Sequence, residues 1–115
     1  MKKKVCVVTS TRADYGILVP LLRRIADDEA LELQLVVTGT HLCSSFGHTV
    51  DEIERDGFAI ARRISILKAE DSERGVSETM AEMLIGFSAF LSEDRPDIAV
   101  LLGDRYEIFA AAAAL

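Results

Sequence analysis

The 115-residue sequence is poor in the features that mark several classes of protein. It has only two cysteines and no Cys-x-x-Cys pair, so neither a disulfide framework nor a structural zinc site is expected. No apolar run approaches the roughly 20 residues that span a bilayer. The first apolar run, residues 5–8, is too short for the core of a signal peptide. The sequence therefore predicts a cytoplasmic protein without a membrane partner.

Basic residues are outnumbered as well. Lysine and arginine total 13 against 19 acidic residues, and the net charge is −6. Nucleic-acid binding usually requires a basic surface and is not predicted. A phosphorylated small molecule fits better, because a few arginines and helix N-termini suffice to bind one. The chain has neither a Gly-x-Gly-x-x-Gly nor a Walker A sequence, so a dinucleotide or nucleoside triphosphate bound in those standard ways is disfavoured.

Apolar runs alternate with amphipathic segments along the chain. Buried strands are predicted at residues 4–9, 33–37, 58–67 and 98–102. The third of these is the least apolar, which places it nearer a sheet edge. Helices are predicted at residues 16–27, 46–56, 72–94 and from about 105 onward. The βαβαβαβα order predicts an α/β fold with a parallel, Rossmann-like sheet and right-handed crossovers.

Apolar stripes predict which face of each helix is buried. In residues 16–27 the stripe consists of Ile17, Leu18, Leu21, Leu22 and Ile25. In residues 72–94 it consists of Val76, Met80, Met83, Leu84, Phe87 and Leu91. Pro20 is expected in the first turn of its helix, where a missing N–H costs little. Thr79 and Glu82 have capping-box spacing, so the regular part of the long helix could begin after residue 72.

Three polar clusters follow predicted strands, at residues 9–12, 38–41 and 103–107. The carboxyl ends of parallel strands meet at one edge of a sheet, where α/β folds bind ligands. Arg12 has the fork geometry that suits phosphate oxygens, or it could pair with Asp14 or another carboxylate. His41 could act as an acid or base, or be a loop histidine bonded to the backbone.

The cluster at residues 103–107 is the strongest of the three. Asp104 could transfer a proton, and Arg105 could neutralise a phosphate or hold Asp104. The alternative is helix capping, with Asp104 as the N-cap and Glu107 three residues later.

The last residues of the sequence, 110–115, look like the middle of a helix without a C-cap, so we expect the chain to be a piece of a longer protein. A short domain with a helical tail is the alternative.

Four segments, in this order, resemble the hydrolysing UDP-N-acetylglucosamine 2-epimerases. They are Thr-Arg-Ala-Asp-Tyr-Gly at residues 11–16, Val-Thr-Gly-Thr-His-Leu at 37–42, residues 46–58, and Leu-Gly-Asp-Arg-Tyr-Glu at 102–107. The resemblance covers nearly the whole chain. The non-hydrolysing relatives have a Gly-Thr-Arg-Pro-Glu type first turn and a Gly-Asp-Thr type fourth turn. The first and fourth turns of this chain differ from these two types, and both differences favour the hydrolysing branch.

The resemblance implies a GT-B-type fold of two Rossmann-like domains. Residues 1–115 would form part of the N-terminal domain, with the C-terminal domain absent from this chain. It implies a homo-oligomer that converts UDP-N-acetylglucosamine and water to N-acetylmannosamine and UDP through a 2-acetamidoglucal, without a metal or other cofactor. The pathway would make sialic, nonulosonic or capsule precursors. The implied catalytic residues are Asp104, His41 and Glu107, and the implied UDP-binding residues are Arg12, Arg105 and Ser10.

Other functions stay open at this point. The substrate could instead be a UDP-linked 2,4-diacetamido-6-deoxy hexose, because the residues that contact the C4 and C6 substituents of the sugar cannot be identified from this sequence. A GT-B glycosyltransferase with a nucleotide-sugar donor would carry similar turns. A non-catalytic α/β binding domain would not need Asp104. The 115-residue piece is expected to be inactive by itself, since the family also uses residues beyond it.

Overall fold

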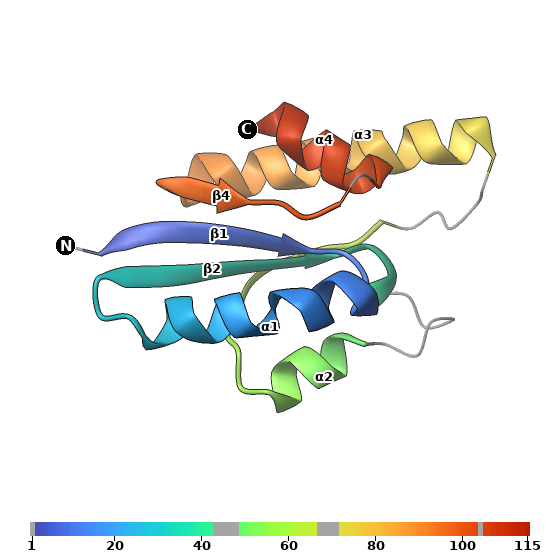
Figure 1. Ribbon diagram of the computed structural model, residues 1–115. Coiled ribbons are helices and arrows are strands. Elements are labelled where there is room, and N and C mark those ends of the chain that lie inside the picture. Colours follow the sequence, from blue (N-terminus) through green and yellow to red (C-terminus); the bar gives the residue numbers. More distant parts are fainter. Residues whose placement is uncertain (1, 43–48, 67–71, 104) are drawn as a thin grey trace.

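A central parallel sheet separates two layers of helices (Figure 1). The computed structural model describes residues 2–42, 49–66, 72–103 and 105–115. In chain order its elements are β1 (Lys3–Thr9), α1 (Arg12–Asp27), β2 (Leu31–Thr38), the 3-10 helix η1 (Gly39–Leu42), α2 (Val50–Arg55), β3 (Ile60–Ile64), α3 (Glu73–Glu93), β4 (Ile98–Val100) and α4 (Tyr106–Ala114). The predicted α/β class and alternating order are confirmed.

The strands lie in the order β3-β2-β1-β4, and every pair is parallel. Val7 of β1 is in register with Leu35 of β2 on one side and Val100 of β4 on the other. The position of β3 at an edge confirms the prediction from its lower apolar content. Because the strands run the same way, β1, β2 and β4 all end on the side of the sheet where α4 begins (Figure 1).

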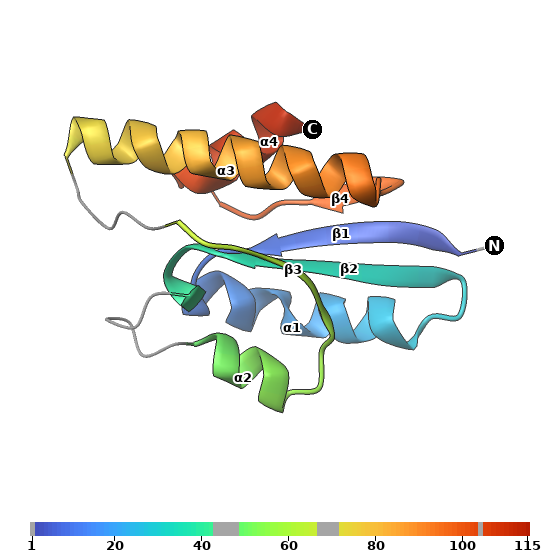
Figure 2. The same cartoon turned by 180° about the vertical axis from the view of Figure 1, so that it is seen from behind.

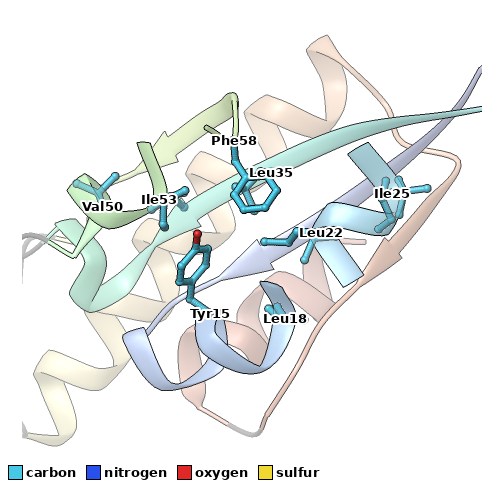
Figure 3. Close-up of a cluster of buried hydrophobic side chains, with 11 residues drawn as sticks. Tyr15, Leu18, Leu22, Ile25, Leu35, Val50, Ile53 and Phe58 are labelled. Atoms are coloured by element: carbon cyan, nitrogen blue, oxygen red, sulfur yellow. The ribbon is translucent and has the colours of Figure 1, made fainter. Parts of the chain in front are cut away.

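The two central strands are buried on both faces. Val7 and Leu35 belong to a cluster under α1 and α2, which Figure 3 shows with Leu22 projecting from α1. Cys6 and Val36 belong to a second buried cluster. This cluster also includes residues of α3 and α4, the two helices that cover the other face of the sheet (Figure 2). This two-sided burial explains why the strands read as continuous apolar runs instead of alternating ones.

Helix α1 begins four residues earlier than predicted. Thr11 is its N-cap and forms a complete capping box with Asp14, which stabilises a helix start at Arg12. Pro20 therefore lies inside the helix and not in its first turn, so that prediction was wrong. The rotation of the helix also differs from the predicted stripe. Its buried side chains are Tyr15, Leu18, Leu22 and Ile25, whereas Ile17 and Leu21 are exposed.

Helix α3 matches the predicted long helix closely. Ser72 is its N-cap and accepts a hydrogen bond from the Gly75 N–H, so the alternative start near Thr79 was wrong. Met83 and Phe87 are buried as predicted, but Leu84 is exposed and Phe90 is buried in its place. Val76, Met80 and Leu91 are only partly buried.

The other predicted bounds differ by a few residues. β2 is longer than predicted, while β3 and β4 are shorter. The predicted second helix is described only as α2, because residues 43–48 lie outside the described residues. Val50 and Ile53 are buried as predicted, and Gly57 follows the helix with φ of 89°. Ala110 and Ala111 are buried in the cluster that α3, α4 and the sheet share. None of the helices that the structure describes is long and apolar enough to cross a membrane.

Candidate functional site at the carboxyl edge of the sheet

The three predicted polar turns meet through contacts between their residues. The Ser10 hydroxyl, after β1, donates a hydrogen bond of 2.5 Å to Glu107 Oε1 at the start of α4. Thr9 Oγ1 lies 2.9 Å from His41 Nε2 in η1. Gly39 packs on Ser10, since a Cβ at Gly39 would lie 2.6 Å from the Ser10 carbonyl oxygen. The prediction that these strand ends come together is therefore confirmed.

The first turn is organised around the Asp14 carboxylate. Asp14 Oδ2 accepts hydrogen bonds from the backbone N–H groups of Ser10 at 3.1 Å and Thr11 at 2.9 Å. The Thr9 hydroxyl also donates to this carboxylate. Because Asp14 is engaged by these donors, it is not the carboxylate that pairs with Arg12.

Arg12 instead pairs with a carboxylate on another element. Its Nε lies 2.5 Å from Glu52 Oε2 on α2, which realises one of the alternatives that the sequence left open. The Arg12 side chain is 56% exposed, so its guanidinium is accessible to a ligand at this edge. Gly16 leaves room for it, because a Cβ there would lie 2.9 Å from Arg12 Nη1.

His41 is fully buried behind the turns. Its Nδ1 lies 2.7 Å from the Thr49 hydroxyl oxygen, its Nε2 contacts Thr9, and its ring packs edge-on against Tyr15 at 6.0 Å. Burial lowers the pKa of His41, although the nearby carboxylate of Asp14 works in the opposite direction. The predicted catalytic role of His41 stays a prediction.

Glu107 is also buried, with 1% of its surface exposed. Its Oε1 accepts a hydrogen bond from the Arg105 Nε–H in addition to the one from Ser10. This hydrogen bond raises the pKa of Arg105 above its ordinary value. The Arg105 side chain is 45% exposed and presents its charge at the edge. Asp104 lies outside the described residues.

The alternative that the sequence left open, a capping box at the start of the last helix, was wrong. Arg105 is the N-cap of α4, and Glu107 is the second residue of the helix, one position too early for a capping box. The Glu107 carboxylate turns toward Ser10 and Arg105 instead, because those donors offer it a buried charge-assisted hydrogen bond.

Sequence reasoning missed several residues that build this edge. Thr11 and Asp14 have the spacing of a capping box, so their pairing was detectable in the sequence. Thr49 and Glu52 gave no such signal, because each acts on a residue of another element.

The assembled edge carries the kinds of group that bind anions in proteins. Arg12 and Arg105 come from two different turns and both are about half exposed, above a buried layer that contains Ser10, His41 and Glu107. Guanidinium groups and helix N-termini are the groups that proteins use for phosphate oxygens. Within the described ranges, no three His, Cys, Asp or Glu side chains gather so as to hold a metal ion. A cavity of about 540 Å³ beside Ile98 and Leu115 lies at the other end of β4 and is not part of this edge.

The parallel sheet and its polar carboxyl edge define a Rossmann-like domain of the kind found in GT-B folds. A family model described as UDP-N-acetylglucosamine 2-epimerase matches residues 23–115, and the chain belongs to this family. This confirms the predicted family.

Relatives in two organisms agree with this assignment. The chain is 39% identical over 114 residues to the UDP-N,N'-diacetylbacillosamine 2-epimerase (hydrolyzing) of Legionella pneumophila, with 99% of this chain and 30% of that protein covered. It is 38% identical over 112 residues to the polysialic acid biosynthesis protein P7 of Escherichia coli, with 97% of this chain and 29% of that protein covered. The chain thus spans about 30% of the length of these relatives.

The fold also matches a solved structure. The UDP-GlcNAc 2-epimerase from Neisseria meningitidis, whose structure is bound to UDP-GlcNAc, superimposes with a TM-score of 0.79 at 19% sequence identity. The match covers 96% of this chain and 28% of that one. At this identity the superposition supports the fold alone.

Proposed function

We propose that the whole protein is a hydrolysing UDP-N-acetylglucosamine 2-epimerase, and that residues 1–115 form part of its N-terminal domain. The observation that carries the proposal is the pair of half-exposed arginines, Arg12 and Arg105, at an edge built by three strand ends. The family match and the order of the four motifs support it. The enzyme would act in the cytoplasm, as a homo-oligomer, in the synthesis of sialic or nonulosonic acids or of a capsule precursor.

The proposed reaction needs a proton acceptor near C2 of the sugar and positive charge near the departing diphosphate. A base removes the proton at C2, the C1–O bond breaks, and UDP leaves with the bonding electrons to give a 2-acetamidoglucal. Water then adds across the double bond, with its hydroxyl at C1 and a proton on the opposite face of C2. Arg12 and Arg105 would stabilise the departing diphosphate, and Asp104 would serve as an acid or base.

The other three predicted site residues lie behind this surface. Ser10, His41 and Glu107 are all buried and bonded to one another's turns. Direct contact of these side chains with the sugar nucleotide stays a prediction. We propose that in this conformation they shape the edge that Arg12 and Arg105 present to the substrate.

Proton NMR in deuterated water tests the function. The whole protein, expressed from the full reading frame, is incubated with UDP-N-acetylglucosamine. We expect free N-acetylmannosamine with deuterium at C2 together with UDP. Asp104→Asn should abolish turnover, while Asp51→Asn on the exposed surface of α2 should leave it intact. Full turnover by Asp104→Asn would contradict the acid/base role of Asp104, whereas absence of turnover in the unmodified protein would favour a non-catalytic domain.

A UDP-linked 2,4-diacetamido-6-deoxy hexose is the second candidate substrate. The name of the relative with 39% identity favours it, since that protein is described as acting on UDP-N,N'-diacetylbacillosamine. Turnover of this sugar nucleotide alone would keep the mechanism and change the substrate. Net transfer of a sugar to an acceptor would instead indicate a glycosyltransferase.

The 115-residue chain by itself should be inactive. It spans about 30% of the relatives' length, and GT-B-type sites lie between two domains. Turnover by the isolated piece at a rate comparable to that of the whole protein would contradict this expectation.

A further inference from the structure

Glu107 joins two turns that are far apart in the sequence. Its Oε1 accepts one hydrogen bond from the Ser10 hydroxyl, 97 residues away, and a second from the Arg105 Nε–H. Its second oxygen, Oε2, is buried and has no hydrogen-bond partner among the residues that the structure describes. A buried carboxylate with one oxygen doubly engaged and the other unpartnered is not the arrangement that gives the most stability.

We propose that Glu107 is a positioning residue, which holds the Arg105 guanidinium in the orientation that binds the diphosphate of the nucleotide sugar and anchors that orientation to Ser10. The proposal rests on the proposed function, because it assumes that the ligand of Arg105 is a nucleoside diphosphate.

The geometry of the guanidinium supports this role. Glu107 engages Nε, and the two terminal nitrogens carry four further N–H donors in a fixed plane. The Arg105 Cζ also lies 5.5 Å from the centre of the Tyr106 ring. The side chain is thus held at its inner nitrogen while 45% of it remains exposed. An arginine that is already ordered loses less conformational freedom when it binds an anion.

The same contacts disfavour proton transfer by Glu107 itself. The carboxylate is 99% buried beneath the edge, and its Oε1 already receives two donors. A group that acts on the sugar must reach it within hydrogen-bond distance, directly or through one water. Glu107 would therefore act through Arg105.

A double-mutant cycle for UDP affinity tests the proposal in the whole protein. UDP is titrated calorimetrically into the unmodified protein, Glu107→Gln, Arg105→Ala and the double variant. We expect Glu107→Gln to weaken UDP binding about tenfold, the effect of one charge-assisted hydrogen bond. In the Arg105→Ala background the same change should weaken binding by less than about twofold, because the residue that it orients is gone. Glu93→Gln, which removes an exposed Arg62 pair on α3, is the matched control and should leave the affinity unchanged.

Two outcomes would overturn the proposal while leaving the function standing. One is that Glu107→Gln weakens UDP binding by the same factor in the unmodified protein and in the Arg105→Ala variant. The other is unchanged UDP affinity with lost turnover, which would make Glu107 a catalytic residue. If Glu107→Gln does not fold, Arg105→Lys replaces it, because lysine keeps the charge but has no Nε–H to offer to Glu107. We then expect about tenfold weaker binding, and an unchanged affinity would overturn the proposal. Failure of the unmodified protein to bind UDP would overturn the proposed function itself.

Discussion

Gly39 of η1 is in direct contact with Ser10, the residue that follows β1. It adopts a φ of 65°, and a Cβ built on it would lie 2.6 Å from the Ser10 carbonyl oxygen. The second turn therefore packs closely against both the backbone and the side chain of Ser10. In the same two turns, His41 contacts Thr9 and Ser10 donates a hydrogen bond to Glu107.

Gly39→Ala should destabilise the protein strongly. The variant combines an unfavourable φ with a steric overlap, for which we expect a loss of about 2–4 kcal/mol in the free energy of unfolding. Gly57→Ala is the matched control, since Gly57 also has a positive φ, of 89°, but nothing lies within 4 Å of the added Cβ. Its expected cost is about 1 kcal/mol. Urea denaturation measures both, and equal losses would show that the contact with Ser10 does not matter.

His41 should make stability depend on pH. Burial lowers its pKa in the folded state below the ordinary value of 6.5, so the unfolded chain binds a proton that the folded chain does not. Its contribution to stability is full above the unfolded pKa and is lost as the pH falls from that value through the lower pKa of the folded state. The charged groups near it are Asp14, Glu52 and Arg12.

We expect unmodified protein to lose more stability between about pH 7.5 and pH 5.5 than His41→Gln does, since glutamine does not titrate. Thermal unfolding at both pH values measures the difference. The variant should also be less stable at the higher pH, because the contacts with Thr9 and Thr49 are disrupted. Parallel pH profiles for the two proteins would show that His41 is protonated in the folded state as readily as in the unfolded state.

The orientation of α1 can be tested by paired truncations. Leu22 is fully buried, so Leu22→Ala should cost about 2–5 kcal/mol. Ile17 is 69% exposed although the apolar stripe predicted it to face inward, so Ile17→Ala should change stability by no more than about 0.5 kcal/mol. Comparable losses from the two variants would support the orientation that the stripe predicted.

Arg12 should matter for ligand binding more than for stability. Its pair with Glu52 lies at the surface and is worth about 0–1 kcal/mol. Arg12→Ala should therefore leave the melting temperature nearly unchanged and weaken UDP binding in the whole protein about tenfold or more. Glu52→Gln, which keeps the arginine, should have the same small effect on stability and retain UDP binding. Equal loss of UDP affinity in both variants would show that the pair, and not the arginine alone, is required.

The alternation of strands and helices was predictable because it depends on local periodicity. The continuous apolar run of β1 indicates burial on two faces, and the weaker run around Ile60–Ile64 indicates an edge. The predicted start of α1 and its predicted buried face were both wrong, the first because a local capping signal was not used and the second because tertiary packing sets the helix orientation. The capping box at Thr11 moved the start of α1, and contacts with the sheet turned Ile17 outward.

By itself the sequence determined the family, the parallel sheet and the polar strand ends, because these depend on residue order and hydrophobic spacing. The tertiary structure decided which polar groups pair across those ends. Arg12 pairs with Glu52 and not with Asp14. Glu107 does not cap its helix and instead accepts a buried hydrogen bond from Ser10. These choices depend on segments that are distant in the chain and become neighbours only when the sheet assembles, so no local pattern encodes them.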